Sequence, residues 1–151
     1  MINRKKQKLA IRNWQDGKGQ HRHYTRQRDD FIGCTSNDAV KNHDFIAVEH
    51  LNIKGLLKNH KLAMAISDAG WYKFQTAVSQ KAATEGIPFI RVPAKNTTQK
   101  CSHCGHICPG DEKIVPGQDE WVCLECGTHN MRDVNAAINI LRLGLQILSE
   151  T

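Results

Sequence analysis

The chain has 151 residues, of which 40% are hydrophobic, 24% charged and only 6% aromatic. This length and composition predict one soluble domain, or one domain with a small module, and the few aromatic residues argue against a large rigid core. The formal net charge of +6 favours polyanionic partners. The chain contains no run of 18 apolar residues, and its basic N-terminus lacks the apolar stretch of a secretory signal. We therefore expect a cytoplasmic protein without a membrane partner, whose cysteines are reduced or metal-bound.

Residues 1–43 form a basic arm, which we expect to be partly helical and partly irregular. Nine Lys and Arg residues stand within residues 1–28 against one acid, Asp16, and Gly17 and Gly19 are expected to interrupt a long helix. The arm is either a solvated tail or a segment that neutralises phosphates. The second interpretation assigns nucleic-acid contacts to Arg4, Lys5, Lys6, Lys8, Arg12, Arg22, Arg26 and Arg28.

Residues 44–98 have the pattern of an α/β unit. A short apolar run at 44–52 is rich in β-branched residues and predicts a strand. Apolar residues at helical spacing predict an amphipathic helix over about 60–84, ended by Gly86. A second buried strand follows at 87–93, with Pro88 suited to its start. Strand, helix and strand in this order predict an α/β fold.

Residues 99–127 contain two copies of the pattern CxxCG, at Cys101–Gly105 and Cys123–Gly127. A tight turn lets two thiolates that are separated by two residues bind one ion, and the glycine after each pair permits a positive φ. The spacing between the pairs fits a four-cysteine zinc site. The alternative is two disulfides or four unrelated thiols. We favour a structural zinc ion held by Cys101, Cys104, Cys123 and Cys126, with no open position for chemistry.

Two other residues of this region, and one cysteine upstream of it, also need an interpretation. Cys108 lacks a partner at the spacing of a metal-binding pair, so we expect it to lie outside the zinc site. Cys34, upstream, is expected to be a packed thiol. Trp121 is expected to pack within the ribbon, with base stacking as the functional alternative.

Two carboxylates are candidates for divalent-metal binding. Glu49 ends the first predicted strand, and Asp133 opens a C-terminal helix, within residues 128–151, that carries an apolar stripe. Carboxylates from distant positions in the sequence could together bind Mg²⁺. Two such ions can activate water and stabilise the leaving oxygen in phosphodiester hydrolysis. The structural alternatives are an exposed strand-end acid for Glu49 and an N-cap for Asp133.

Three phrases in fixed order, VEHLN, NTTQKCSHCG and RDVNAAINIL, resemble the C-terminal part of the transposon-associated TnpB/OrfB proteins. These are similar to the RuvC-type nuclease half of compact type V CRISPR effectors. The resemblance extends from about Arg28 to Gly144. It implies a partial RNase H-like (RuvC-type) α/β nuclease domain with an inserted four-cysteine zinc ribbon.

The resemblance also implies a function, which is RNA-guided, Mg²⁺-dependent DNA cleavage linked to transposition, with DNA and guide RNA as partners. Glu49 matches the glutamate of the second family motif and Asp133 the aspartate of the third. The zinc ligands of the family match the four cysteines already named. Bound to DNA, such a protein would be associated with the nucleoid.

The chain departs from the family pattern in its acids. No strand carries the aspartate of the first motif, and Met131 replaces the first acid of the third motif. We therefore expect Glu49 and Asp133 to be vestigial, and the chain to be a truncated protein that binds nucleic acid without cleaving it alone. The alternatives are a stand-alone zinc-ribbon binding protein and one half of a split nuclease, completed by a chain that supplies the missing strands.

Overall fold

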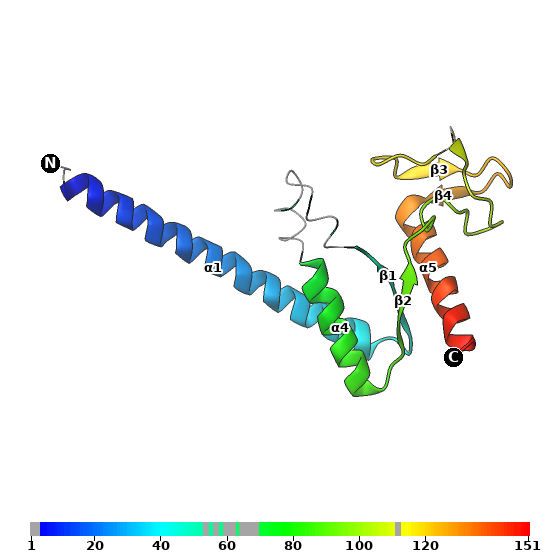
Figure 1. Cartoon of the computed structure of the whole chain (residues 1–151), viewed down its shortest axis with the longest axis horizontal. Helices are drawn as coiled ribbons and strands as arrows, with labels where there is room; N and C mark the ends of the chain where they lie inside the picture. The colour runs from blue at the N-terminus through cyan, green and yellow to red at the C-terminus, as the bar shows by residue number, and fades with distance from the viewer. Residues whose placement is uncertain (1–3, 53–54, 56–57, 59–62, 64–69, 111–112) are drawn as a thin grey trace.

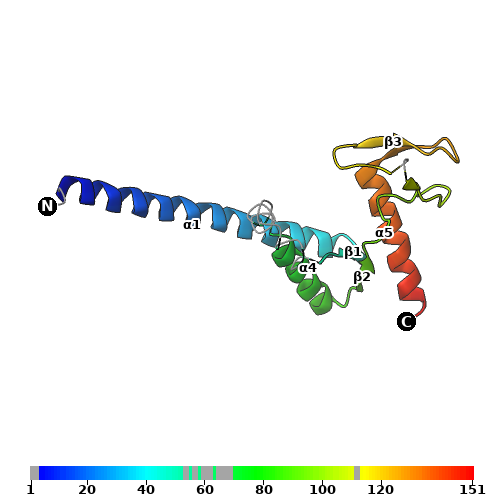
Figure 2. The same cartoon turned by 45° about the horizontal axis from the view of Figure 1, so that its top comes forward.

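The computed structural model describes residues 4–52, 55, 58, 63, 70–110 and 113–151, and within its first helix the side chains from His23 onward. That helix, α1 (Arg4–Lys41), is one continuous element of 38 residues. Its N-terminal half projects away from the other labelled elements in both views (Figure 1, Figure 2). The expected interruption at Gly17 and Gly19 is therefore wrong, because a local glycine preference of about 1 kcal/mol per residue does not end a helix that its neighbours continue.

A β–α–β unit follows α1. Strand β1 (Ile46–His50) leads through the segment before α4 (Trp71–Glu85) to β2 (Phe89–Pro93), and the two strands are parallel. The register pairs Ala47 with Ile90 and Glu49 with Val92. The predicted α/β order is confirmed, and α4 ends as predicted at Gly86 in the left-handed conformation. Most of the predicted helical stretch before residue 70 lies outside the described residues.

Helix α4 packs across the C-terminal half of α1, and the first hydrophobic cluster lies between them (Figure 1). Val40, Val78 and Ala82 are buried there, with Phe74 and Phe89 packed against them. Polar contacts fix the same interface. The Lys81 ammonium donates to the Gly33 carbonyl at 2.8 Å and to the Ser36 hydroxyl at 2.6 Å.

The segment that carries the two CxxCG turns and the two short strands after the first turn, which we call the ribbon, contains a second, separate hydrophobic cluster. Its strands β3 (Glu120–Val122) and β4 (His129–Met131) are antiparallel. Trp121 is buried, as predicted, and packs with Ile114, Cys108 and two of the predicted ligands. Cys34 is exposed on α1, so the expectation that it is a packed thiol is wrong.

The last helix, α5 (Arg132–Ser149), joins the ribbon to the sheet (Figure 1). It begins directly after β4 and packs against β1 and β2. Gly144 allows the closest approach, because a Cβ at this position would lie 2.6 Å from the Cβ of Ala47. The side of α5 that is buried carries Asn135, Ala136, Asn139 and Gly144. The apolar stripe seen in the sequence is exposed over Val134, Ile138, Leu141, Leu145 and Leu148.

No helix in the described part of the chain is long and apolar enough to span a membrane.

Candidate metal centre and carboxylate site

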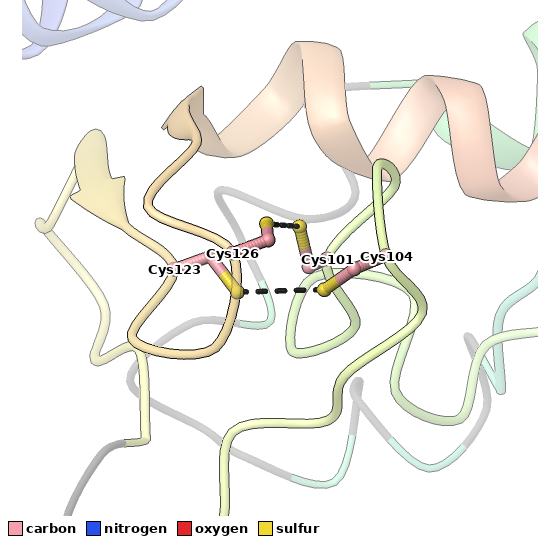
Figure 3. Close-up of side chains that lie close together, drawn as sticks. All are labelled: Cys101, Cys104, Cys123 and Cys126. Carbon is pink, nitrogen blue, oxygen red and sulfur yellow. Dashed lines mark hydrogen bonds between the residues drawn. The ribbon is translucent and has the colours of Figure 1, made fainter.

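Four cysteine side chains from the two turns of the ribbon converge on one point (Figure 3). All four Sγ atoms lie within 4.8 Å of one another. The Cys101 and Cys126 sulfurs are 3.8 Å apart, and the Cys104 and Cys123 sulfurs are 3.7 Å apart. A disulfide needs about 2.05 Å between the sulfurs, so these pairs are not disulfides.

The distances fit a metal ion at the centre of the cluster. Zinc–thiolate bonds of about 2.3 Å in a tetrahedron separate the sulfurs by about 3.8 Å, which agrees with both measured pairs. Cys101 and Cys123 are buried, whereas Cys104 and Cys126 are exposed. The cluster can therefore hold a metal such as zinc. Because all four positions come from protein sulfurs, such an ion would stabilise the ribbon and leave no position for a substrate.

The two turns are built alike. The Gly105 N–H donates to the Cys101 carbonyl at 2.9 Å, and the Gly127 N–H donates to the Cys123 carbonyl at 2.8 Å. Both glycines have positive φ, 82° and 69°, which explains why each pattern ends in glycine. Each turn thus directs its two sulfurs to the same side.

The thiols differ in proton affinity. The hydroxyl and the backbone N–H of Thr128 lower the pKa of Cys126 to about 6. A backbone hydrogen bond at His106 lowers the pKa of Cys104, but desolvation and the other three sulfurs outweigh it and raise this pKa to about 12. A thiol with a pKa this high binds a metal only by losing its proton, so metal binding to this cluster must release protons.

Two buried asparagines of α5 hold the segment that enters the ribbon. The Asn135 side chain accepts from the Ser102 N–H at 2.7 Å and donates to the Lys100 carbonyl at 2.8 Å. The Asn139 amide donates to the Thr97 carbonyl at 2.9 Å and to the Lys100 carbonyl at 2.7 Å. We call these two residues the asparagine clamp. The clamp fixes residues 97–102 against α5 and so fixes the first metal-binding turn.

Glu49 is connected to the same segment. The buried Thr97 side chain donates its hydroxyl hydrogen to Glu49 Oε1, and the Thr97 carbonyl is held by Asn139. The Gln75 amide donates to the Glu49 backbone carbonyl at 3.3 Å. A chain of hydrogen bonds therefore runs from α5 through Thr97 to the carboxylate at the end of β1. Glu49 is half-buried and is not the freely exposed acid of the alternative interpretation.

Asp133 lies in the first turn of α5 and is exposed. The N-cap is Met131, which makes no side-chain hydrogen bond to the helix, so the alternative interpretation of Asp133 as the N-cap is wrong. Its charge still suits the N-terminal end of the helix dipole. The contacts of α5 place Gly144 beside Ala47 and Asn139 beside Thr97, so Glu49 lies toward the Asp133 end of the helix. Asp133 is six residues from Asn139, about 9 Å along the helix axis.

Comparisons with known proteins agree with this arrangement. Residues 71–140 match the family model of the Cas12f1-like TNB domain. The chain is 36% identical over 126 residues to a putative RNA-guided DNA endonuclease of Streptomyces pristinaespiralis, and 29% identical over 132 residues to a TnpB-like protein of Acanthamoeba polyphaga mimivirus. Each match covers 83% of this chain. The chain belongs to the TnpB family. The resemblance seen in the sequence is thereby confirmed.

The match covers only part of the relatives. This TnpB-family chain spans 30% of the length of the Streptomyces protein and 24% of the mimivirus protein. A solved structure of a Cas12f1–sgRNA–target DNA complex contains a similar fold, with a TM-score of 0.63 and 19% identity, over 90% of this chain and 40% of that one. This likeness supports the arrangement of elements described above.

The structure brings some of the predicted site residues together and leaves others apart. The four cysteines come together, and Cys108 lies beside them in the hydrophobic cluster but outside the four-sulfur group. Among the described residues, no group of three or more potential ligands includes Glu49 or Asp133. Within the predicted basic arm, Arg26 is exposed and Arg28 half-buried, whereas the other six predicted contact side chains lie outside the described part.

Sequence reasoning missed Thr97 and the asparagine clamp. Asn135 and Asn139 stand four residues apart on the polar side of an otherwise apolar helix. A polar face opposite an apolar stripe ordinarily predicts exposure to solvent, so the local pattern does not mark these amides, or Thr97, as buried.

Proposed function

We propose that this chain is a nucleic-acid-binding part of a TnpB-type RNA-guided DNA endonuclease, with a partial RNase H-like fold and a structural zinc ion in its ribbon. The single observation that carries the proposal is the four-sulfur cluster, whose distances fit a zinc tetrahedron and which the asparagine clamp fixes against α5. Zinc would stabilise the ribbon, and DNA or guide RNA would bind to the basic surfaces of the ribbon and of α1. The names of the relatives support nucleic acid as the partner.

We further propose that Glu49 and Asp133 derive from a Mg²⁺ site and do not cleave DNA in this chain alone. Two-metal hydrolysis needs carboxylates that bridge or flank both ions. Among the described residues, Glu49 and Asp133 share no third potential ligand. Glu49 instead accepts a hydrogen bond from Thr97. The chain alone would therefore bind nucleic acid without hydrolysing it.

The test is a paired binding and cleavage measurement on the zinc-loaded chain. Labelled DNA and RNA are titrated at several salt concentrations, and DNA cleavage is followed with Mg²⁺ for the wild type, Glu49→Ala and Asp133→Ala. We expect salt-sensitive binding in all three proteins and cleavage in none. Glu125→Ala, which removes an exposed acid of the second metal-binding turn, is the matched control.

Two results would contradict the proposal. Cleavage by the wild type that both substitutions abolish, while Glu125→Ala retains it, would show that the two acids still form an active metal site. Failure of the wild type to bind any nucleic acid while it retains zinc would remove the proposed function itself.

A further inference from the structure

We propose that two copies of this chain associate through the unpaired edge of β1 and the exposed apolar side of α5. β1 pairs with β2 along one edge, and no strand of the described residues pairs with its other edge. Five apolar side chains of α5 are 37–53% exposed, and we call them the leucine stripe: Val134, Ile138, Leu141, Leu145 and Leu148. An exposed apolar surface beside a free strand edge is typical of an interface with another chain. This surface contains no cation and no metal ligand, so the inference does not depend on the proposed function.

The free edge of β1 and the leucine stripe lie side by side. Gly144 faces β1, because a Cβ at this position would lie 2.6 Å from the Cβ of Ala47. Asn139 and Gln146, on one side of Gly144 around the helix, line a cavity together with Lys95, which follows β2. At 3.6 residues per turn the leucine stripe lies on the other side of Gly144. The stripe therefore projects past β1, away from β2. Figure 1 shows α5 and α4 on opposite sides of the two strands.

The backbone of β1 presents hydrogen-bonding groups at its free edge. The Ile46 N–H donates to the Pro88 carbonyl at 3.0 Å, toward β2. Successive residues of a strand direct their N–H and C=O groups to opposite edges, so those of Ala47 and Glu49 face away from β2. The Glu49 carbonyl already accepts a hydrogen bond from the Gln75 amide. Ala47 is therefore the position around which another strand can pair.

The outer edge of β2 is less suited to pairing. Pro93 has no N–H to donate, and Arg91 is charged, and both residues are exposed. Prolines and charged side chains of this kind protect a strand edge from pairing with another chain. β1 carries neither a proline nor a lysine or arginine, and the carboxylate of Glu49 accepts a hydrogen bond from Thr97. The two edges of this sheet thus differ, and the one beside the leucine stripe is the unprotected one.

A second copy covers both free surfaces in one symmetric arrangement. Two β1 strands that pair antiparallel around Ala47 form a four-stranded sheet in the order β2–β1–β1–β2, with a two-fold axis perpendicular to the sheet. This axis keeps both α5 helices on the same face. Strands lie about 4.8 Å apart, so two helices that are each centred over their own pair of strands are about 10 Å apart. Helices ordinarily pack at about 8–10 Å, and the two leucine stripes therefore meet across the axis.

The symmetry decides which side chains of the stripe meet. Gly144 lies beside Ala47 and hence level with the axis, so the Leu145 side chains of the two copies face each other. Leu141 then faces Leu148 of the second copy. The stripe spans 14 residues, about 21 Å along the helix, which is a small interface, so we expect a dissociation constant of about 10–100 µM. Each copy has a net charge of +6, and higher salt should strengthen the association by screening this repulsion.

The experiment measures the molar mass of the full zinc-loaded chain, free of nucleic acid, by sedimentation equilibrium. Concentrations run from about 1 to about 300 µM, in the range of the expected dissociation constant, at low and at high salt. The variants are Leu145→Glu and Leu145→Lys, each alone and in an equal mixture. The matched controls are Leu124→Glu and Leu124→Lys, at an exposed leucine of the second metal-binding turn. Zinc content and the thermal midpoint show that each variant is folded.

We expect the wild type to change from monomer to dimer over this range. Each Leu145 variant alone should dimerise about 100-fold more weakly or worse, because two like charges meet at the axis. The equal mixture should recover dimers, since glutamate then faces lysine. The Leu124 controls should behave as the wild type does.

Hydrogen exchange tests the strand edge separately. A peptide over residues 45–50 should gain protection at high protein concentration, whereas a peptide of α4 around Val78 should not change. A wild type that stays monomeric at every concentration would overturn the inference and would leave the surface to a different chain. Dimers that form without added protection of residues 45–50, or Leu145 variants whose mixture does not recover dimers, would also overturn it. None of these results changes the binding test of the proposed function.

Discussion

At the scale of single residues, two buried amides determine how the ribbon is attached. The side-chain amides of Asn135 and Asn139 form hydrogen bonds with backbone groups of residues 97–102. The Ser102 N–H and the Thr97 carbonyl are buried under α5, where an unpaired polar group costs about 1–3 kcal/mol. The clamp therefore contributes to stability and also sets the position of the first metal-binding turn and of Thr97.

We predict that Asn139→Ala lowers the free energy of unfolding by about 2–3 kcal/mol, because the Thr97 and Lys100 carbonyls lose a shared donor. Urea denaturation of the zinc-loaded chain measures this change. Gln146→Ala, which removes an exposed amide from the same helix, should change the value by less than about 0.5 kcal/mol. Equal losses in both variants would show that the clamp contributes nothing beyond helix propensity.

At the scale of elements, α5 has two faces with different roles. One face packs on the sheet through Gly144 and on the ribbon through the clamp, whereas the leucine face remains exposed in the described structure. The distance between α5 and β1 depends on Gly144, which has no side chain to separate the helix from the strand. The Cβ of Ala47 is fixed to the strand backbone and cannot turn aside as the end of a flexible side chain can.

We predict opposite effects for the same substitution at two helical glycines. Gly144→Ala should destabilise the chain by about 1–3 kcal/mol, because the new Cβ would lie 2.6 Å from the Cβ of Ala47 and 2.9 Å from Phe45. Gly33→Ala in α1 should stabilise it by about 0.5–1 kcal/mol, since nothing lies within 4 Å of its Cβ position. Chemical denaturation of both variants gives the signs, and a neutral result at Gly144 would contradict the close contact.

At the scale of the whole molecule, the described residues have two hydrophobic clusters with no buried residue in common. One lies between α1, α4 and the sheet, and the other lies inside the ribbon, where two of its five buried members are predicted zinc ligands. A cluster of this size with short strands lacks enough apolar burial to fold without a metal or another constraint. The two clusters should therefore respond differently to loss of zinc.

We predict that a strong chelator removes hydrogen-exchange protection from residues 100–130 while peptides of α4 around Val78 and Ala82 keep theirs. Exchange is followed by mass spectrometry on the full chain before and after chelation. Addition of zinc should restore the protection, and magnesium, as the control ion, should not, because it prefers oxygen ligands. Simultaneous loss of protection in α4 would show instead that the two clusters unfold as one unit.

The sequence alone determined the features that depend on local spacing. Two CxxCG patterns predict their own turns, because the sulfur spacing and the positive φ of Gly105 and Gly127 are set within five residues. The strand, helix and strand order was likewise predicted from hydrophobic periodicity and the flanking Gly86 and Pro93. The family also followed from the order of three short phrases, which the comparisons confirm.

Only the tertiary structure decided the features that depend on contacts between distant segments. Periodicity identified the leucine stripe of α5 but not its exposure, since burial depends on which elements are present to cover a face. Local propensity placed a break at Gly17 and Gly19, but α1 continues. Glu49 stands 48 residues from Thr97 along the chain, and Asn139 stands 42 residues from Thr97, beyond the range of any local pattern. Those long-range hydrogen bonds connect the predicted metal centre to Glu49.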